Sequence, residues 1–301
     1  MIIFLIYSCN STKKVPQDNF LLTKNNFEYI DKGPFNRTIP ELVNQKPNKK
    51  DFLMLFPFGL WIYNGSNPKY DSILSEYMTF PNDIRNQKLR DSLYLKYNHP
   101  EYVGKSIFWS RVRHNIGNPP VVLDEDKTSS SANSIRKYLV YRGYWDAKVD
   151  FSHRMDTLAK KAQANYKITY KDPTYIKDYF YNIPYDNIRN AYEQNINDSF
   201  IKSGNILDET KLEDEVKRIT DLMQEKGYYS FNKNGGEISF TADTLKGRKQ
   251  VPLTMDILKD SIKSPYKLYT IGDIEIQYLD KIAGKPTIDE VFNNVNIKKV
   301  S

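Results

Sequence analysis

The sequence predicts an α+β protein of tandem modules, each a three-stranded sheet with two helices on one face. The first observation behind this fold class is an internal repeat, in which residues 123–144 align without a gap on residues 207–228. The second is that the repeated segment has the apolar period of a helix and ends at a glycine. The third is that stretches of alternating apolar and polar residues follow each copy, as in half-buried strands.

A strand is predicted at the start of a module. Tyr179, Tyr181 and Ile183 recur at every second position before the second copy of the repeat. Residues 274–278 alternate in the same way near the C-terminus. A helical region and then the repeated helix follow the first strand, so the expected order is strand, helix, helix, strand, strand.

The repeated helix carries one apolar stripe in both copies. The stripe residues are Ala132, Ile135 and Leu139 in the first copy, and Leu212, Val216, Ile219 and Met223 in the second. Thr210 and Glu213 have the spacing of a capping box at the helix start. Gly143 and Gly227 stand where a left-handed residue is needed, so each helix is predicted to end there.

Two strands follow each repeated helix and are predicted to form a hairpin. In the first copy the alternating patterns cover residues 145–151 and 163–170. In the second copy they cover residues 237–243 and 250–257. This period of two means that each strand buries one face and exposes the other.

The spacing between the predicted elements sets the expected domain boundaries. Residues 1–17 are a signal segment and tether, residues 18–171 form the first module, and residues 172–262 form the second. The first module carries an insertion over about residues 48–118, because many more residues separate its first strand from the repeated helix. Residues 263–301 hold a partial third module that stops before its repeated helix and hairpin. We therefore expect a fragment or a truncated gene product.

The only cysteine follows a short apolar segment at the N-terminus. Residues 6–9 resemble a bacterial lipobox, in which the thiol of Cys9 is lipidated and fatty acids such as palmitate anchor the chain. The alternative is a buried cysteine in a first strand. We favour lipidation, because residues 10–17 form a polar tether. A single cysteine excludes an internal disulfide and a cysteine zinc site.

The net charge of +7 leaves two interpretations of the lysine surface. The densest cluster, Lys46, Lys49 and Lys50, is either a solvated surface or a contact to anionic lipid headgroups. The longest apolar run, residues 52–63, is about half the ~20 residues that span a bilayer. A buried core segment is the preferred interpretation of that run, and an interfacial membrane contact is the alternative. No aromatic-basic recognition motif indicates a nucleic-acid partner.

Catalytic motifs are absent from the sequence. It has no nucleophile elbow, no phosphate loop and no H-E-x-x-H pair. His99, His114 and His153 are scattered, and none has a paired carboxylate at helical spacing. We therefore expect no enzyme activity, no metal ion and no cofactor.

Five short motifs occur in a characteristic order and spacing. They are Gln45-Lys46-Pro47-Asn48-Lys49, Leu60-Trp61-Ile62-Tyr63-Asn64, Gly117-Asn118-Pro119-Pro120-Val121, Gly143-Tyr144-Trp145-Asp146-Ala147 and Gly227-Tyr228-Tyr229-Ser230-Phe231. Together they resemble the POTRA domains of the outer-membrane assembly factor family, the relatives of BamA and TamA. The similarity covers residues 12–277 and is greatest to the lipoprotein form of Bacteroidetes, TamL. The C-terminal membrane β-barrel of that family is missing from this sequence.

The resemblance implies a binding role in outer-membrane protein assembly. The modules would hold unfolded outer-membrane proteins, next to the β-barrel or partner assembly proteins. An extended client can add to an open sheet edge through main-chain hydrogen bonds, and in the family the middle of the three strands is that edge. The candidate residues are Trp145, Asp146, Ala147, Lys148, Val149, Asp150, Phe151, Glu237, Ile238, Ser239, Phe240, Thr241, Ala242 and Asp243. The alternative is that both are ordinary edge strands, blunted by charges and without a client.

Two other classes of lipoprotein remain as alternatives. A surface glycan-binding lipoprotein of a Bacteroidetes-like bacterium would use the tyrosines as a sugar platform, although most of them follow strand alternation. A lipoprotein hydrolase would need a nucleophile motif. In the lineage of the family, surface export usually needs acidic residues after the lipidated cysteine, and residues 10–14 supply none. The resemblance therefore implies a lipid anchor in the outer membrane that faces the periplasm.

Overall fold

The computed structural model describes most of the two predicted modules. The described residues are 11–50, 57–66, 109–110, 112–231, 238–245, 247–258, 266–272, 274–279, 286–292 and 295–300. The chain divides into two compact units. The first unit comprises Met1–Val140 and Tyr144–Asp172, and the second comprises Tyr141–Gly143 and Pro173–Ser301.

The sheet of the first unit has three strands, with the last of them in the middle. They are β1 (Leu21–Tyr29), β2 (Lys148–Asp156) and β3 (Lys161–Thr169), in the order β1-β3-β2. Strand β1 runs parallel to β3, whereas β2 pairs with β3 as an antiparallel hairpin. Tyr166 of β3 therefore has Phe27 on one side and Phe151 on the other. Both flanking strands are edges of this sheet.

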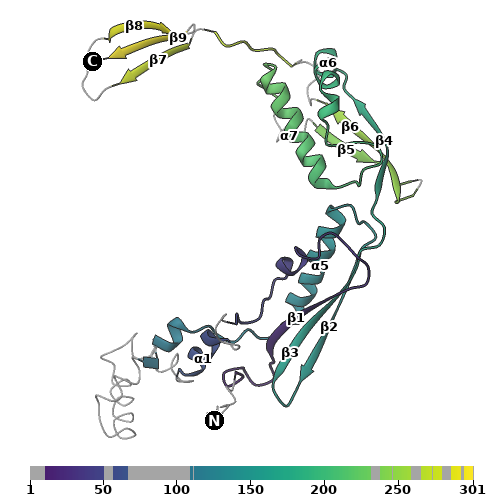
Figure 1. Ribbon diagram of the computed structural model, residues 1–301, viewed down its shortest axis with the longest axis vertical. Helices are drawn as coiled ribbons and strands as arrows, with labels where there is room; N and C mark the ends of the chain where they lie inside the picture. Colours follow the sequence, from purple (N-terminus) through teal and green to yellow (C-terminus); the bar gives the residue numbers. More distant parts are fainter. Residues whose placement is uncertain are drawn as a thin grey trace, which may run out of the picture. The chain divides into compact units, whose positions relative to one another are not determined.

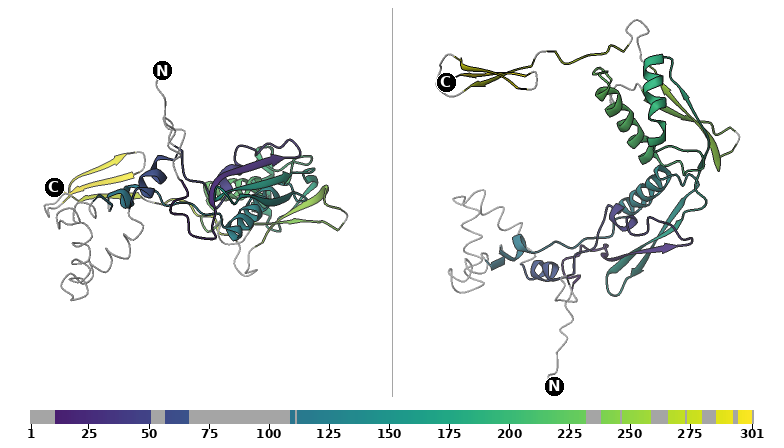
Figure 2. Two further views of the ribbon diagram at one scale, coloured as in Figure 1. Left: turned by 90° about the horizontal axis from the view of Figure 1, so that it is seen from below. Right: turned by 45° about the horizontal axis from the view of Figure 1, so that its top comes forward.

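One long helix covers this sheet, as Figures 1 and 2 show. Helix α5 (Glu125–Tyr141) buries its predicted stripe of Ala132, Ile135 and Leu139 against the side chains of β3. Its C-terminal end has the geometry predicted for Gly143, whose φ is +91°. The Tyr144 N–H donates to the Leu139 carbonyl at 2.9 Å, which is the Schellman arrangement.

The first unit differs from the prediction in its other helix. A 3-10 helix, η1 (Ile39–Leu42), takes the place of an α-helix after β1. Pro40 lies in its first turn, and Pro34 stands shortly before it. Proline removes a backbone donor and disfavours helical geometry in the residue before it, so only a short turn forms here. A short helix, α1 (Phe58–Asn64), lies inside the predicted insertion.

The second unit confirms the predicted order of strand, helix, helix, strand, strand. Its elements are β4 (Tyr175–Asn182), α6 (Asp186–Gln194), the 3-10 helix η2 (Ile196–Asp198), α7 (Glu209–Glu225), β5 (Ile238–Ala242) and β6 (Gln250–Ile257). The sheet order is β4-β6-β5, with β4 parallel and β5 antiparallel to β6. Ile188 and Tyr192 of α6, with Ile219 and Met223 of α7, pack in one core with the buried side chains of β6.

The two long helices begin at the aspartate of the repeated Leu-Asp-Glu motif. The Asp208 side chain accepts from the Thr210 N–H at 3.0 Å and caps α7. Asp124 accepts from the Lys127 N–H, also at 3.0 Å, ahead of α5. The capping box predicted from Thr210 and Glu213 is therefore wrong, because the acceptor lies two residues earlier in the chain.

The C-terminal part of the second unit forms a further sheet. Strands β7 (Ile274–Leu279), β8 (Pro286–Phe292) and β9 (Val295–Val300) have the order β7-β9-β8, with the same parallel and antiparallel pairing as the other two sheets. The alternation in the sequence predicts only the first of these strands. The available signal for the other two is Asn293-Asn294, a residue type favoured in two-residue hairpin turns.

Candidate functional site

Strands β2 and β5 each lie at an edge of their sheet. In each unit the chain returns from this strand into the central position, so the middle strand in sequence is the outer strand in space. Such an edge presents backbone N–H and C=O groups that its own sheet does not pair. These groups can add an extended chain as a further strand.

The opposite edge of the first sheet is covered where it starts. The Leu22 N–H donates to the Val121 carbonyl at 2.8 Å, and the Leu123 N–H donates to the Phe20 carbonyl at 2.8 Å. Residues 121–123 lie just before α5 and so occupy the start of the β1 edge. An incoming chain cannot pair with backbone groups that are already bonded.

The second unit covers the start of β4 in the same way. The Ile176 N–H donates to the Asn205 carbonyl at 2.8 Å, and the Gly204 N–H donates back to the Ile176 carbonyl at 2.7 Å. The Leu207 N–H donates to the Thr174 carbonyl at 2.9 Å. In both units the segment before the long helix therefore covers the start of one edge of the sheet. The opposite edges, β2 and β5, are left as the candidate site.

The predicted stretch in the first unit begins too early. Trp145 and Asp146 lie in a turn in which the Ala147 N–H donates to the Tyr144 carbonyl at 3.0 Å, and β2 starts only at Lys148. Ala147 is buried, whereas Trp145 is half-buried. The apolar residues Trp145, Ala147 and Val149 alternate as in a strand. The chain nevertheless forms a turn after the helix end at Gly143 and becomes extended only at Lys148.

The predicted stretch in the second unit agrees more closely. Residues 238–242 form β5, and Asp243 follows directly with its N–H donating to the Pro252 carbonyl at 3.0 Å. Glu237 lies outside the described residues. Of the candidate residues, Trp145 to Ala147 thus lie in a turn, Lys148 to Phe151 belong to β2, and Ile238 to Ala242 form β5.

Strand β2 presents two exposed apolar side chains, of which Phe151 belongs to the predicted stretch and Met155 lies beyond it. Phe151 is 37% exposed beside the buried Tyr166, and Met155 is 51% exposed beside the buried Ala162. These side chains lie on the sheet face that α5 covers farther along, because they alternate in phase with buried residues of β3. An added strand would cover this apolar surface as well as the backbone edge.

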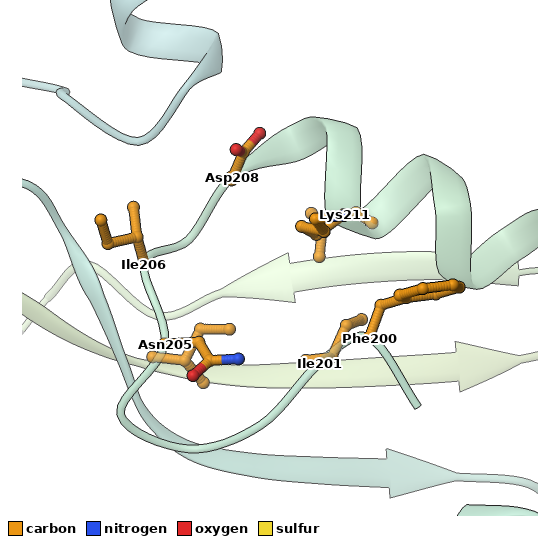
Figure 3. Close-up of a pocket in the computed structure, with 8 residues that line it drawn as sticks. Phe200, Ile201, Asn205, Ile206, Asp208 and Lys211 are labelled. Carbon is orange, nitrogen blue, oxygen red and sulfur yellow. The ribbon is translucent and has the colours of Figure 1, made fainter. Parts of the chain in front are cut away.

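A pocket of about 270 Å³ lies beside the covered start of β4 (Figure 3). Its two charged side chains already have partners. Asp208 caps α7 and pairs with Arg142 at 3.1 Å, and Lys211 pairs with Asp214 at 3.1 Å while lying 5.2 Å from the ring centre of Phe200. Packing around the helix start therefore explains this pocket.

The tyrosines of the two cores cannot form a sugar platform. Tyr166, Tyr170 and Tyr192 are fully buried, and burial raises the pKa of each phenol above its ordinary value. Tyr179 is bonded to Tyr192 through their hydroxyls at 3.0 Å, and burial raises its pKa too. Core packing explains these side chains.

Cys9 and the residues around it lie outside the described part of the chain, so its lipidation stays a prediction. Among the described residues, no cluster of three or more His, Cys, Asp or Glu side chains could hold a metal ion. The helices in that part of the chain are also too short or too polar to cross a bilayer.

Comparisons with known proteins return structures but no sequence family. No family model matches the chain, and no curated protein matches it. The BamA of Haemophilus ducreyi without POTRA domains 1–3 aligns with 47% of this chain and 24% of its own, at 16% identity and a TM-score of 0.29. The chain therefore spans about a quarter of that structure.

Two other solved structures align over most of this chain. POTRA domains 3–5 of Haemophilus influenzae BamA cover 81% of it and 99% of their own length, at 11% identity and a TM-score of 0.27. POTRA domains 1–2 of the Omp85 periplasmic domain from Anabaena cover 82% and 100%, at 9% identity and a TM-score of 0.30. At these TM-scores the likenesses carry no functional argument, so the α+β fold is assigned from its own strand order and register.

Proposed function

We propose that this chain is the periplasmic client-binding region of an outer-membrane protein assembly factor of the POTRA type. In this role β2 and β5 hold unfolded outer-membrane proteins by β-augmentation. We further propose that the factor is the Bacteroidetes lipoprotein form, anchored to the outer membrane through Cys9 and facing the periplasm. Its partners would be unfolded clients, a β-barrel and other assembly proteins.

The observation that carries the proposal is the asymmetry of the two sheet edges. In both units the start of the outer parallel strand is bonded to the segment before the long helix, through Val121 in one and Asn205 in the other. The antiparallel outer strand has no such cover among the described residues. The repetition of this asymmetry in two units of different sequence supports a binding role for β2 and β5.

Augmentation suits a client that has not yet folded. An unfolded barrel strand is an extended chain with free backbone groups, and main-chain pairing depends little on side-chain identity. The exposed Phe151 and Met155 add apolar contact for the alternating residues of such a strand. Affinity should be low and tolerant of client sequence, because a single added strand must be ordered when it binds.

The test is amide chemical-shift mapping of the full chain with a peptide taken from a barrel strand. The matched control is the same peptide N-methylated at alternate residues, which removes the donors along one of its edges. We expect shifts in the amides of β2 or β5 with the first peptide and their loss with the second. Shifts confined to α5 and α7, equal binding of both peptides, or no binding at millimolar peptide would contradict the proposal.

A further inference from the structure

A second cavity, of about 450 Å³, lies in the first unit away from the edge strand β2. Its walls come from the start of β1, the start of β3, helix α1 and the chain near residues 47–50. No residue of β2 lines it. Its volume is within the range of about 300–1,000 Å³ that is usual for ligand pockets.

The inner part of this cavity is apolar. Leu21 and Leu60 are buried with Val15 in a small core beside it. Trp61 lines the cavity, is 51% exposed, and stacks on Phe58 with a ring distance of 5.6 Å. A half-exposed indole beside buried leucines offers apolar surface that a ligand can cover.

Hydrogen bonds fix the wall opposite the strands. The Asn48 side chain donates to the Pro119 carbonyl at 2.7 Å and accepts from the Val121 N–H at 2.9 Å. Asn48 lines the cavity, and Val121 belongs to the segment that covers β1. This wall is thus held in place by hydrogen bonds between the Asn48 side chain and the main chain, so a ligand need not order it when it binds.

Among the described residues that line the cavity there are three lysines and no carboxylate. Lys24, Lys50 and Lys161 are all exposed, and none forms an ion pair with a carboxylate in the described part of the chain. The pocket beside β4 differs, since its Lys211 is paired with Asp214. Positive side chains that form no ion pair, next to apolar surface, favour a ligand with an anionic end and an apolar body.

A peptide backbone has little to recognise here. Leu21 and Lys161 are register partners across the β1–β3 ladder, and Leu22 is bonded to Val121 on its other side. The strand groups at the cavity are therefore already paired, so recognition depends on apolar contact and charge rather than on β-augmentation.

We propose that this cavity binds an anionic amphiphile, with its acyl chain against Leu60 and Trp61 and its anionic head on Lys24, Lys50 and Lys161. The ligand chemistry is an acyl chain that carries a phosphate or carboxylate. Its source is an anionic phospholipid of a membrane surface or a free fatty acid. This site is separate from β2 and β5 and does not rest on their function.

The experiment is fluorescence titration of the full chain with Trp109→Phe and Trp145→Phe, which leaves Trp61 as the only tryptophan. The probe is dodecyl phosphate below its micelle concentration. We expect a saturable blue shift, because the acyl chain removes Trp61 from water. Butyl phosphate, which lacks most of the apolar chain, and uncharged dodecyl maltoside should each bind at least about tenfold more weakly.

Two sets of lysine substitutions separate the cavity from general surface charge. Lys24→Gln, Lys50→Gln and Lys161→Gln together should weaken dodecyl phosphate binding by about tenfold or more. The control set, Lys32→Gln, Lys137→Gln and Lys167→Gln, removes the same charge from exposed lysines that do not line the cavity, and should leave binding within about twofold. Circular dichroism checks the fold of both.

The source is identified by repeating the titration with vesicles and with myristate. A Trp61 shift on phosphatidylglycerol but not phosphatidylcholine vesicles supports a membrane phospholipid. A shift with submicellar myristate alone supports a free fatty acid. Equal loss of binding in both lysine sets, equal binding of dodecyl maltoside, or no saturable change with any anionic probe overturns the proposal.

Discussion

The Asp243 N–H donates to the Pro252 carbonyl at 3.0 Å, and this bond sets the direction of the backbone groups in β5. Residues of an antiparallel pair alternate between facing the partner strand and facing away. The N–H of Thr241 therefore faces β6, whereas the N–H groups of Phe240 and Ala242 point out of the sheet. A client strand would pair with these outward groups.

The glycine that ends α5 should be sensitive to substitution for a steric reason. A Cβ at Gly143 would lie 2.5 Å from Ile206 Cγ2 and 2.8 Å from the Leu207 oxygen, at a φ of +91°. Gly204 has a similar φ of +87°, and a Cβ there would meet nothing within 4 Å. Urea unfolding should show that Gly143→Ala costs about 1–3 kcal/mol more than Gly204→Ala. Equal costs would mean that only backbone strain matters.

Breaking the ion pair between Glu215 and Arg218 should strongly destabilise the second unit. Glu215 is fully buried and accepts from Arg218 at 2.6 and 2.9 Å, from the Ser199 hydroxyl and from the Phe200 N–H. Removing one partner leaves the other charge buried, so Glu215→Gln should lower the free energy of unfolding by about 3–5 kcal/mol.

The control for that substitution is Asp214→Asn on the same helix. It breaks the exposed pair with Lys211, and such pairs contribute about 0–1 kcal/mol. Thermal unfolding of the two variants under one set of conditions makes the comparison. A cost for Glu215→Gln no greater than that of Asp214→Asn would contradict a stabilising role for the buried pair.

Alkaline pH should destabilise the second unit through its buried tyrosines. Burial raises the pKa of Tyr179 and Tyr192 in the folded state, while an unfolded tyrosine ionises at pH ~10. Above that pH the unfolded state binds fewer protons than the folded state, so the free energy of unfolding falls as pH rises. Melting temperatures measured from about pH 8 to 11 should decline, and Tyr179→Phe should flatten the decline. A pH-independent melting temperature would refute this.

Lipidation of Cys9 can be tested in cells. Metabolic labelling with a fatty-acid analogue should mark the wild-type chain and leave Cys9→Ser unmarked, because the thioether forms on the sulfur. Membrane anchoring depends on the attached acyl chains, so membrane fractionation should also show release of the variant. Equal labelling of both chains would contradict lipidation at this residue.

Much of the fold can be predicted because its local signals agree with its packing. The stripe from Leu212 to Met223 predicts α7, and the left-handed glycines at 143 and 227 predict both helix ends. The alternation in β3 and β6 is clear because a central strand buries one whole face. The strand order, and with it the edge positions of β2 and β5, follows from the repeat together with the family resemblance.

The remaining features depend on contacts that leave no period in the sequence. The segments around Val121 and Asn205 cover their strands through a few backbone bonds, which any side chain permits. The cavity beside Trp61 is assembled from separate stretches of chain. The short η1 follows from prolines that interrupt a helical region, and the repeat does not include the residues where they lie.

The most direct test of client binding compares Ala242→Pro with Ala242→Val in the same peptide titration. Proline removes the outward N–H of residue 242 and leaves the inward ladder of Thr241 intact, while valine keeps the donor. In β2, Lys148 is less suitable for a proline substitution because it is the first residue of its strand, where proline is tolerated.

The measured quantity is the peptide affinity read from the amide shifts of β5 alone, with the melting temperature of each variant as the folding control. We predict that Ala242→Pro weakens this affinity by about fivefold relative to Ala242→Val, as expected for one net hydrogen bond of ~1 kcal/mol. Equal affinity of the two variants, in proteins of equal stability, would contradict main-chain pairing at β5.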